Sequence, residues 1–456
     1  MKTAKLKRIS PCDLHLNFTE VDEGLSARQA FEESNRCLYC YDAPCTNACP
    51  TSIDIPSFIK KIASGNLIGS ARTIMKANPV GASCARVCPT EELCEGACVL
   101  NSSTAPIQIG KLQRYTTDWA IENKPVLFEK GMSNGLKVAI IGSGPAGLSA
   151  ARELALLGYV VTIYEASHEA GGLNTFGIVS FRLPQKISFW EVNQVKELGV
   201  RIETNTEIGK DLGLGYLQDH FDYIVVAVGM GSVPSLGIEG EHLTGVLDAI
   251  DFVKSTKGNQ LTEDYKGKRM VVIGAGNTAI DAATCSVRLG AENVQILYRR
   301  TAEEMTAYDF EYEFAKQDGV EFRWLTAPKR IIGDGIGNVT GIECQTVALH
   351  QEEKDGRRRP IPIKGSEYVI PCDAIIKAIG QTRHVSLIHA LGLDHKNGVV
   401  TVNPDSYQTS NGKIYACGDV IFGKGTGEAM VVSAAQQGKN VAESIHKSLM
   451  DAQLVQ

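Results

Sequence analysis

Residues 137–166 read KVAIIGSGPAGLSAARELALLGYVVTIYEA. An apolar run at 138–141 leads directly into Gly142, and an amphipathic stretch separates it from a second apolar run that ends at Glu165. This pattern predicts a strand, a tight glycine turn, a helix and a second strand parallel to the first. With all four parts in register, the stretch predicts a dinucleotide-binding βαβ unit.

The spacing of the glycines gives each of them a physical role. Gly142 makes the tight turn, Gly144 lets the backbone approach a pyrophosphate, and Gly147 lets helix and strand pack closely. The pyrophosphate is bound by free N–H groups at the helix N-terminus. Glu165 follows at the distance where an acid binds ribose hydroxyls, which a bare tight turn would not need. The candidate contacts in the turn are Gly142, Ser143, Gly144, Pro145, Ala146 and Gly147.

A second turn of the same kind occurs at 269–300, RMVVIGAGNTAIDAATCSVRLGAENVQILYRR. Gly274 and Gly276 open it, and Ala279 occupies the third small position. The strand that follows ends in Arg299 and Arg300 instead of an acid. Arginine at this place can bind the 2′-phosphate of NADP. The alternative is a solvated basic pair at a strand end.

Further apolar runs that end in glycine complete the pattern. They are FDYIVVAVGMG at 221–231 and CDAIIKAIGQT at 372–382, and each predicts a strand. The segment 411–446 predicts a strand, then Gly418 and Asp419, a glycine-rich loop and a long helix. This order predicts one nucleotide-binding fold, a second one inserted into it, and a return to the first.

The N-terminal region contains two groups of cysteines. RCLYCYDAPCTNACP at 36–50 has the spacing C-x2-C-x4-C-x3-C-P, and CARVCPTEELCEGAC at 84–98 follows. Structural zinc, disulfides and iron–sulfur clusters are the three interpretations. Zinc favours close pairs separated by longer loops, and disulfides are rare in a reducing compartment. The C-P endings resemble bacterial iron–sulfur sequences, so we expect two [4Fe–4S] clusters.

Residues 1 to about 125 predict a small helical domain. Ile55, Phe58, Ile59 and Ile62 fall on one helical face, and a second helix is expected from Ile109. Metal binding is expected to contribute to the folding of this domain. The cysteines outside the two groups are expected to be small buried residues: Cys12, Cys285, Cys344, Cys372 and Cys417.

The composition excludes several classes of protein. The chain has 456 residues, 43% of them hydrophobic and 21% charged, which is ordinary for a globular protein. A net charge of -6 gives no indication of nucleic-acid binding. The N-terminus lacks the apolar core of a signal peptide, and no apolar run is long enough to span a membrane. We therefore expect a protein of the reducing cytoplasm.

The stretch from about 137 to 446 resembles the two-dinucleotide-domain flavoprotein reductases. The resemblance implies that FAD occupies the first turn and NAD(P)H the second, and that the segment around Gly418 and Asp419 closes over the flavin. Thioredoxin reductases in that group have a redox C-x-x-C in the nicotinamide domain. This chain has no such pair there, so we do not expect disulfide reduction.

The whole chain is similar to the small subunit of glutamate synthase and to the first half of dihydropyrimidine dehydrogenase. The phrases CLYCYDAPCTNACP, CARVCPTEELCEGAC, APIQIGKLQ and FRLP favour the second family. TAEEMTAYDFE at 301–311 is closer to glutamate synthase. The dehydrogenase pattern implies interleaved ligands: Cys37, Cys40, Cys45 and Cys98 for one cluster, and Cys49, Cys88, Cys94 and the amide oxygen of Gln113 for the other. Thiol spacing alone would have selected Cys84 in place of Gln113.

The same resemblance implies nucleotide contacts at further positions. FAD contacts are implied at Glu165, Leu173 and Arg182. NADPH contacts are implied at Ala275, Gly276, Asn277, Thr278, Arg299, Arg300, Ala378, Ile379 and Gly380, and NADH stays an alternative cofactor. The sequence assigns no catalytic acid or base.

These observations together predict an α/β protein with a helical iron–sulfur domain and two Rossmann-like domains, the NAD(P)H domain inserted in the FAD domain. The expected boundaries are 1–125, 126–250, 251–375 and 376–456. The implied activity is oxidation of NAD(P)H through FAD and two [4Fe–4S] clusters. The implied partner is an FMN and iron–sulfur subunit that reduces uracil or thymine, in a heterotetramer. The alternatives are a glutamate synthase small subunit, a ferredoxin-linked oxidoreductase, and a protein that uses its clusters for sensing or assembly.

Overall fold

The computed structural model describes residues 13–258, 261–352, 358–423 and 429–454. They form two compact units. The larger unit contains Asp22–Thr175, Leu183–Met230 and the chain from Arg383 onward. The inserted unit contains Phe176–Arg182, Gly231–Thr382 and the described residues up to Val21. Cys12 lies outside the described residues. The expected domain boundaries stay a prediction.

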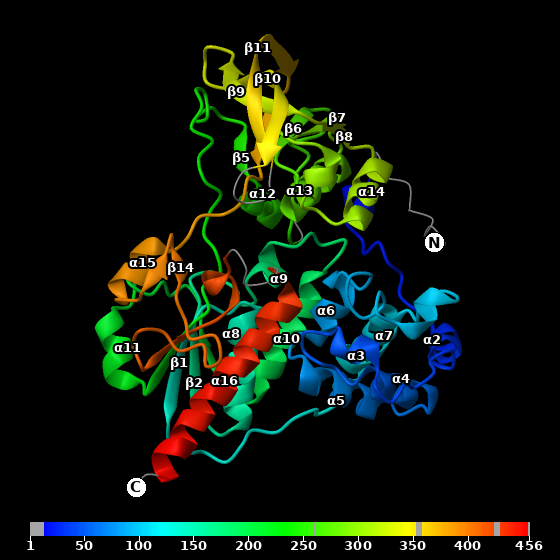
Figure 1. The fold of residues 1–456 in the computed structure, drawn as a ribbon, viewed down its shortest axis with the longest axis vertical. Coiled ribbons are helices and arrows are strands. Elements are labelled where there is room, and N and C mark those ends of the chain that lie inside the picture. Colours follow the sequence, from blue (N-terminus) through cyan, green and yellow to red (C-terminus); the bar gives the residue numbers. More distant parts are fainter. Residues whose placement is uncertain (1–12, 259–260, 353–357, 424–428, 455–456) are drawn as a thin grey trace. The chain divides into compact units, whose positions relative to one another are not determined.

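The larger unit is built on a five-stranded parallel sheet in the order β15-β4-β1-β2-β3. Helix α8 connects β1 to β2, and the long helix α16 packs along α8 (Figure 1). A Cβ at Gly438 of α16 would lie 2.1 Å from the carbonyl oxygen of Ala146, so only glycine permits this approach. The elements are β1 (Lys137–Ile141), α8 (Pro145–Leu156), β2 (Val160–Tyr164), α10 (Gln185–Glu197), β3 (Arg201–Glu203), α11 (Leu214–His220), β4 (Tyr223–Val226), α15 (Val385–Ala390), β13 (His395–Lys396), β14 (Val399–Val400), β15 (Ile414–Ala416) and α16 (Val431–Leu454).

The inserted unit repeats this topology with a parallel sheet in the order β5-β12-β6-β7-β8. Helix α13 connects β6 to β7 just as α8 connects β1 to β2. Both predicted strand–turn–helix–strand units, and the insertion of one fold in the other, are confirmed. The elements are β5 (Val246–Asp248), α12 (Ala249–Ser255), β6 (Arg269–Ile273), α13 (Asn277–Arg288), β7 (Asn293–Leu297), α14 (Asp309–Asp318), β8 (Glu321–Arg323) and β12 (Ala374–Lys377).

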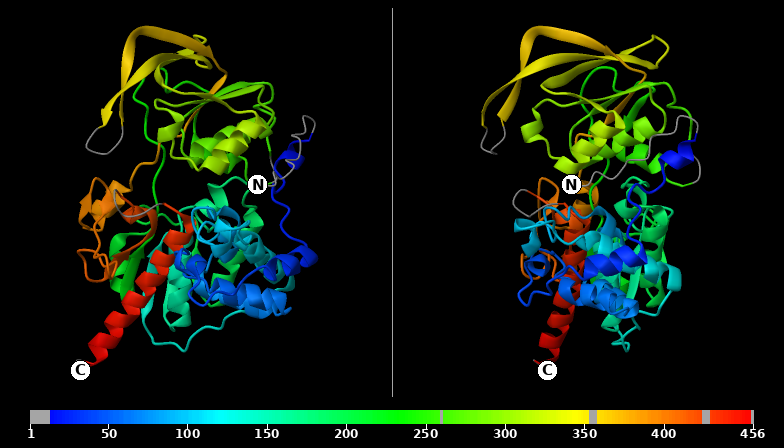
Figure 2. Two further views of the ribbon diagram at one scale, coloured as in Figure 1. Left: turned by 45° about the vertical axis from the view of Figure 1, so that its right-hand side comes forward. Right: turned by 90° about the vertical axis from the view of Figure 1, so that its right-hand side faces the viewer.

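The sequence did not predict the antiparallel sheet of the inserted unit, formed by β9 (Thr326–Gly333), β10 (Val339–Glu352) and β11 (Arg358–Pro371). Figure 2 shows its strands as a curved yellow-to-orange ribbon beyond the parallel sheet of the same unit. Most of β11 is exposed. Alternating apolar and polar residues are the pattern that predicts a strand from sequence. A strand without a buried face lacks this pattern.

Short helices form the cysteine-rich part of the larger unit. The predicted apolar face of α4 is confirmed, since Ile55, Phe58, Ile59 and Ile62 are all buried. Helix α7 begins at Ile109 as expected. The helices here are α2 (Ala27–Ser34), α3 (Pro44–Asn47), α4 (Ile55–Ala63), α5 (Leu67–Ala77), α6 (Gly81–Val87) and α7 (Ile109–Asn123); α1 (Leu14–Asn17) and α9 (Leu173–Phe176) are short helices elsewhere.

Candidate functional site

The first nucleotide turn contains two kinds of glycine. Packing requires two of them, Gly142 and Gly147, and the third, Gly144, has open space beside it. A Cβ at Gly142, which has a φ of 101°, would lie 2.4 Å from the carbonyl oxygen of Ala227. A Cβ at Gly147 would lie 2.1 Å from the carbonyl oxygen of Gly142. At Gly144, a Cβ would meet no heavy atom of the described residues within 4 Å. This open space lies at the N-terminus of α8, where a pyrophosphate could be bound.

Glu165 stands at the end of β2 and links the turn to a cavity. Its Oε2 accepts hydrogen bonds from Ser143 N and Oγ at 3.0 and 2.6 Å, and its Oε1 accepts one from Ser167 N at 2.8 Å. Glu165 also lines a cavity of about 300 Å³ together with Gly142 and Lys210. The acid thus fixes the turn and faces a space suited to a nucleoside.

Gly418 and Asp419 follow β15 at the same end of the sheet. Gly418 N donates to Gln437 Oε1 of α16 at 2.7 Å, and a Cβ at Gly418 would lie 3.0 Å from that of Ala146 in the first turn. Arg383 Nη1 donates to the carbonyl oxygen of Asp419 at 2.6 Å. Burial raises the pKa of the Asp419 carboxyl. The structure therefore brings these two residues against the first turn.

The second turn repeats the backbone geometry of the first. Gly274 has a φ of 125°, and its Cβ would lie 2.1 Å from the carbonyl oxygen of Ala378. At Gly276 a Cβ would meet one heavy atom of the described residues within 4 Å, Thr306 Oγ1 at 3.2 Å. Asn277 begins α13, and its Oδ1 accepts from Tyr308 N at 3.2 Å. The remaining predicted contacts lie in the same turn or next to it on the β12 side: Ala275, Thr278, Ile379 and Gly380.

The two arginines after β7 differ in their surroundings. Arg299 is exposed, whereas Arg300 is buried and donates from Nε to the carbonyl oxygen of Arg358 at 3.0 Å. This bond uses one donor of Arg300, and the described residues leave the terminal nitrogens of its guanidinium for an anion. The pair is not the uniformly solvated pair of the alternative interpretation.

The other two implied FAD contacts lie apart from the first turn in the sequence. Leu173 begins α9 and is partly exposed. Arg182 belongs to the inserted unit and forms ion pairs with Asp281 at 3.0 Å and with Glu311 at 2.5 Å. Burial raises the pKa of Glu311 to about 7. The roles of Leu173 and Arg182 toward a flavin stay predictions.

Four thiols line one cavity in the helical part of the larger unit, which we call the first cysteine cavity. They are those of Cys37, Cys40, Cys45 and Cys98. Apolar side chains, including Ile59, complete its wall. Burial raises the pKa of Cys45 to about 11. A metal cluster bound here would have to displace thiol protons, as is usual for thiolate ligands.

The second cysteine cavity is lined by Cys49, Cys88, Cys94, Cys84 and Gln113. Gln113 Nε2 donates to the carbonyl oxygen of Gly81 at 2.7 Å, which leaves Oε1 as the free acceptor of the amide. Both candidates for the fourth ligand, Gln113 and Cys84, therefore lie at the cavity, and the choice between them stays a prediction.

The donors of both cavities fit iron–sulfur clusters, which are held by soft thiolate ligands. Every cysteine that the structure describes is a free thiol, including the buried Cys285, Cys344, Cys372 and Cys417. No group of three or more His, Cys, Asp or Glu side chains among the described residues could hold a single metal ion. Within the described chain, no helix combines the length and apolar character needed to cross a bilayer.

Two family models match the chain. Residues 15–125 match the dihydropyrimidine dehydrogenase domain II, 4Fe-4S cluster, and residues 136–438 match the pyridine nucleotide-disulphide oxidoreductase family. The cysteines and Gln113 of the two cavities fall in the first range, and both nucleotide turns fall in the second.

Curated relatives and solved structures agree with these matches. The chain is 34% identical to a glutamate synthase [NADPH] small chain of Escherichia coli, over 94% of this chain and 93% of that protein. It is 34% identical to the NAD-dependent dihydropyrimidine dehydrogenase subunit PreT of Salmonella typhimurium, over 95% and 97%. Mycobacterium tuberculosis FprA in complex with NADPH shares the fold, with a TM-score of 0.57 and 20% identity over 70% of this chain and 85% of that chain.

A 4Fe-4S domain thus precedes the two nucleotide-binding folds, and the chain matches two curated relatives over nearly their whole length. The chain belongs to the family of FAD- and iron–sulfur-dependent NAD(P)H oxidoreductases that includes the dihydropyrimidine dehydrogenase subunit PreT and the glutamate synthase small chains.

Proposed function

We propose that the chain is the electron-input subunit of a two-subunit pyrimidine reductase. It oxidises NADPH, and a partner subunit with FMN and iron–sulfur clusters reduces the 5,6 bond of uracil or thymine. The observation that carries this proposal is the interleaving of the cysteines. Cys98 of the second run joins the first cavity, and Cys49 of the first run joins the second cavity. The dihydropyrimidine dehydrogenase pattern implies this grouping.

Each part of the chain has a separate task in this scheme. The turn at Gly274 to Thr278 binds the nicotinamide dinucleotide, and Arg299 with Arg300 binds its 2′-phosphate. The turn at Gly142 to Gly147 binds FAD, and the two cysteine cavities hold two [4Fe–4S] clusters. When bound there, FAD would supply the hydride acceptor and a source of single electrons, and the clusters would supply a path for these electrons.

The second cysteine cavity has a wall residue from α16, the helix that also contacts the segment expected to close over the flavin. Val432 of α16 lines this cavity and packs on Cys84. The same helix holds Gly418 through Gln437. The wall of the second cavity and the segment that closes over the flavin are thus supported by one helix. We therefore assign this cavity to the cluster that receives electrons first.

The names of the relatives support a partner subunit, but they indicate two different enzymes. PreT is named as a subunit of a dihydropyrimidine dehydrogenase. The Escherichia coli relative is named as the small chain of a glutamate synthase and matches over 93% of its length. The second candidate function is therefore electron delivery for glutamate synthesis.

Reconstitution distinguishes the two candidates. The purified chain should hold about one FAD and about eight irons and should reduce dyes with NADPH but not reduce uracil. Addition of an FMN pyrimidine subunit should start uracil-dependent NADPH oxidation, and addition of a glutamate synthase large chain should not start glutamate formation. Uracil reduction by the chain alone would contradict the proposal, and glutamate formation would favour the second candidate.

Iron analysis tests the proposed ligand set separately. Gln113→Ala should lower the iron content by about half because one of two clusters loses a ligand. Cys84→Ser is the matched control in the same cavity, and it should retain both clusters. The opposite result would assign Cys84 as the ligand and contradict the implied role of Gln113.

A further inference from the structure

Two side-chain amides line the second cysteine cavity, and hydrogen bonds fix the orientation of both. Gln113 donates from Nε2 to Gly81 O at 2.7 Å and so presents an oxygen. Asn78 does the reverse, because its Oδ1 accepts from Val80 N at 3.0 Å. A flipped Asn78 amide would place two N–H groups against each other. The cavity is thus offered an acceptor by Gln113 and a donor by Asn78.

The donor of Asn78 has no partner in the part of the chain that the structure describes. Asn78 is 0% exposed, and its Nδ2 makes no hydrogen bond there. A buried N–H group without an acceptor destabilises a folded protein, so nearly all such groups are paired. The acceptor of Asn78 is therefore expected inside the cavity. The thiol-lined wall indicates an acceptor that contains sulfur.

We propose that Asn78 donates a hydrogen bond to a sulfur atom of the cluster held by Cys49, Cys88 and Cys94, and that this bond raises the reduction potential of that cluster. The proposal rests on the proposed function, which places a [4Fe–4S] cluster in this cavity. Reduction adds negative charge to the cluster, so a donor at sulfur stabilises the reduced form more than the oxidised form. Hydrogen bonds to sulfur are one of the established determinants of cluster potential.

Cations from the nucleotide-binding fold hold the segment that precedes Asn78. Helix α5 ends at Ala77, and its last carbonyl groups point toward α8 and α16. Arg152 of α8 donates to Met75 O at 2.6 Å and to Lys76 O at 2.8 Å, and Lys439 of α16 donates to Ala77 O at 2.7 Å. Positive charge at a helix C-terminus stabilises that end of the helix.

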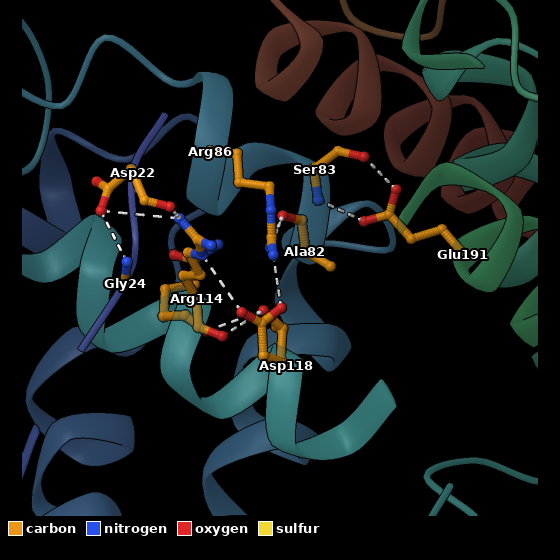
Figure 3. Close-up of polar contacts among 10 residues, drawn as sticks. Asp22, Gly24, Ala82, Ser83, Arg86, Arg114, Asp118 and Glu191 are labelled. Atoms are coloured by element: carbon orange, nitrogen blue, oxygen red, sulfur yellow. Dashed lines mark hydrogen bonds and ion pairs between the residues drawn. The ribbon is translucent and has the colours of Figure 1, made fainter. Parts of the chain in front are cut away.

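A carboxyl group from the same fold holds the segment that follows. Glu191 of α10 accepts hydrogen bonds from Ser83 N at 2.8 Å and from Ser83 Oγ, in the first turn of α6 (Figure 3). Figure 3 also shows Arg86 of α6 and Arg114 of α7 converging on Asp118, at 2.7 and 3.3 Å. The residues on both sides of Asn78 are fixed, so its amide is preorganised toward the cavity.

A redox titration of the full chain, followed by electron paramagnetic resonance, tests the proposal. Asn78→Ser keeps a short side-chain oxygen for Val80 N but removes the amide N–H, and its single hydroxyl group is too short to replace both functions of the amide. We expect the reduction potential of one cluster to fall by about 59 mV, which is about a tenfold change in the equilibrium constant for one electron. The potential of the other cluster should not change. Asn78→Asp should lower the potential further because it adds a negative charge. Asn66→Ser makes the same change at the exposed N-cap of α5 and should alter neither cluster.

The outcomes separate this proposal from the proposed function. Iron and sulfide analysis of the wild type comes first, and a single cluster in the first cavity would overturn the proposed function and with it this inference. Two clusters with unchanged potentials in Asn78→Ser and Asn78→Asp would overturn the role of Asn78 alone. If both variants lost the second cluster, wild-type protein labelled with ¹⁵N-asparagine would decide. An exchangeable proton and a ¹⁵N nucleus coupled to the reduced cluster would support the bond, and their absence would overturn it.

Discussion

The two nucleotide turns have the same backbone geometry and opposite charge at the end of the following strand. In each turn the first glycine lies under a carbonyl oxygen of a neighbouring segment, that of Ala227 in one and Ala378 in the other. Glu165 directly follows β2, whereas Arg299 and Arg300 lie just beyond the end of β7. Backbone packing therefore builds both turns alike, and the side chains after the second strand are what differs between them.

The comparison also separates two roles of glycine within one turn. Gly142 and Gly274 have positive φ values and no room for a Cβ. Gly144 and Gly276 have φ values of ordinary extended residues, and space is open or nearly open beside them. We therefore expect the first pair to serve the fold and the second pair to serve the ligand. Substitutions at these positions test the distinction directly.

The largest effect is expected for Gly142→Ala. The new Cβ would meet Ala227 O at 2.4 Å in a backbone conformation that alanine disfavours. We expect a loss of about 2–5 kcal/mol in the free energy of unfolding, measured by chemical denaturation of the chain without nucleotide. Gly144→Ala is the control and should unfold like the wild type. Equal destabilisation by both changes would refute the division of roles.

A smaller, selective effect is expected for Gly144→Ala on cofactor content. The added methyl group occupies the space left for the pyrophosphate, so FAD affinity should fall by roughly 100-fold, or about 2.8 kcal/mol. Binding of NADPH to the second turn should not change. Gly276→Ala should weaken NADPH binding and leave FAD affinity unchanged. Flavin absorbance after gel filtration and calorimetric NADPH titration measure the two effects, and simultaneous loss of both cofactors would argue against independent turns.

The arginine pair should set the preference for NADPH over NADH. Each charge-assisted bond to the 2′-phosphate contributes roughly 1.5–3 kcal/mol, so we expect about 10- to 100-fold for one arginine. Arg299→Ala/Arg300→Ala should raise the Michaelis constant for NADPH and leave that for NADH nearly unchanged. The measurement is kcat/KM with each cofactor. The relatives carry both NADPH and NAD in their names, and a wild type that prefers NADH would mean that the pair does not contact the nucleotide.

The smallest effect is expected for Glu165→Gln. The amide keeps one oxygen to accept from Ser143 but loses the second acceptor, which binds Ser167 N. We expect FAD to bind about tenfold more weakly, or about 1.4 kcal/mol, with no change for NADPH. Fluorescence titration of the flavin-free protein measures the affinity. A change in NADPH affinity of the same size would indicate a general loss of structure.

The sequence was sufficient for the parts of the molecule that rest on local patterns. Both βαβ units, the helix that begins at Ile109 and the apolar face of α4 follow from periodicity and glycine spacing. The grouping of cysteines into two cavities required the family resemblance. Cysteines in one cavity are up to about sixty residues apart in the sequence, so their spacing does not state which of them meet.

Other features depend on contacts between distant segments and leave no local signal. The pairing of β9, β10 and β11 is made by backbone groups on a largely exposed ribbon. In the sequence, Asn78 is an ordinary residue at the end of a helix and before a proline. The orientation of its amide follows only from the hydrogen bond that Val80 N donates to its Oδ1. Glu191 lies among helical residues of α10 and contacts Ser83, far away in the sequence. These positions become visible only when the fold is known.

The adjacency of β4 and β15 has a consequence for how the protein is made. Residues 227–413 separate these neighbouring strands, so a ribosome that adds about 5–20 residues per second needs roughly 10–40 s between them. During that time the edge of β4 has no partner, and unpaired edges promote association between chains. The last segment also brings Val432 to the second cysteine cavity. We therefore expect iron–sulfur loading of that cavity to follow synthesis and folding of α16, and chains truncated before β15 to aggregate.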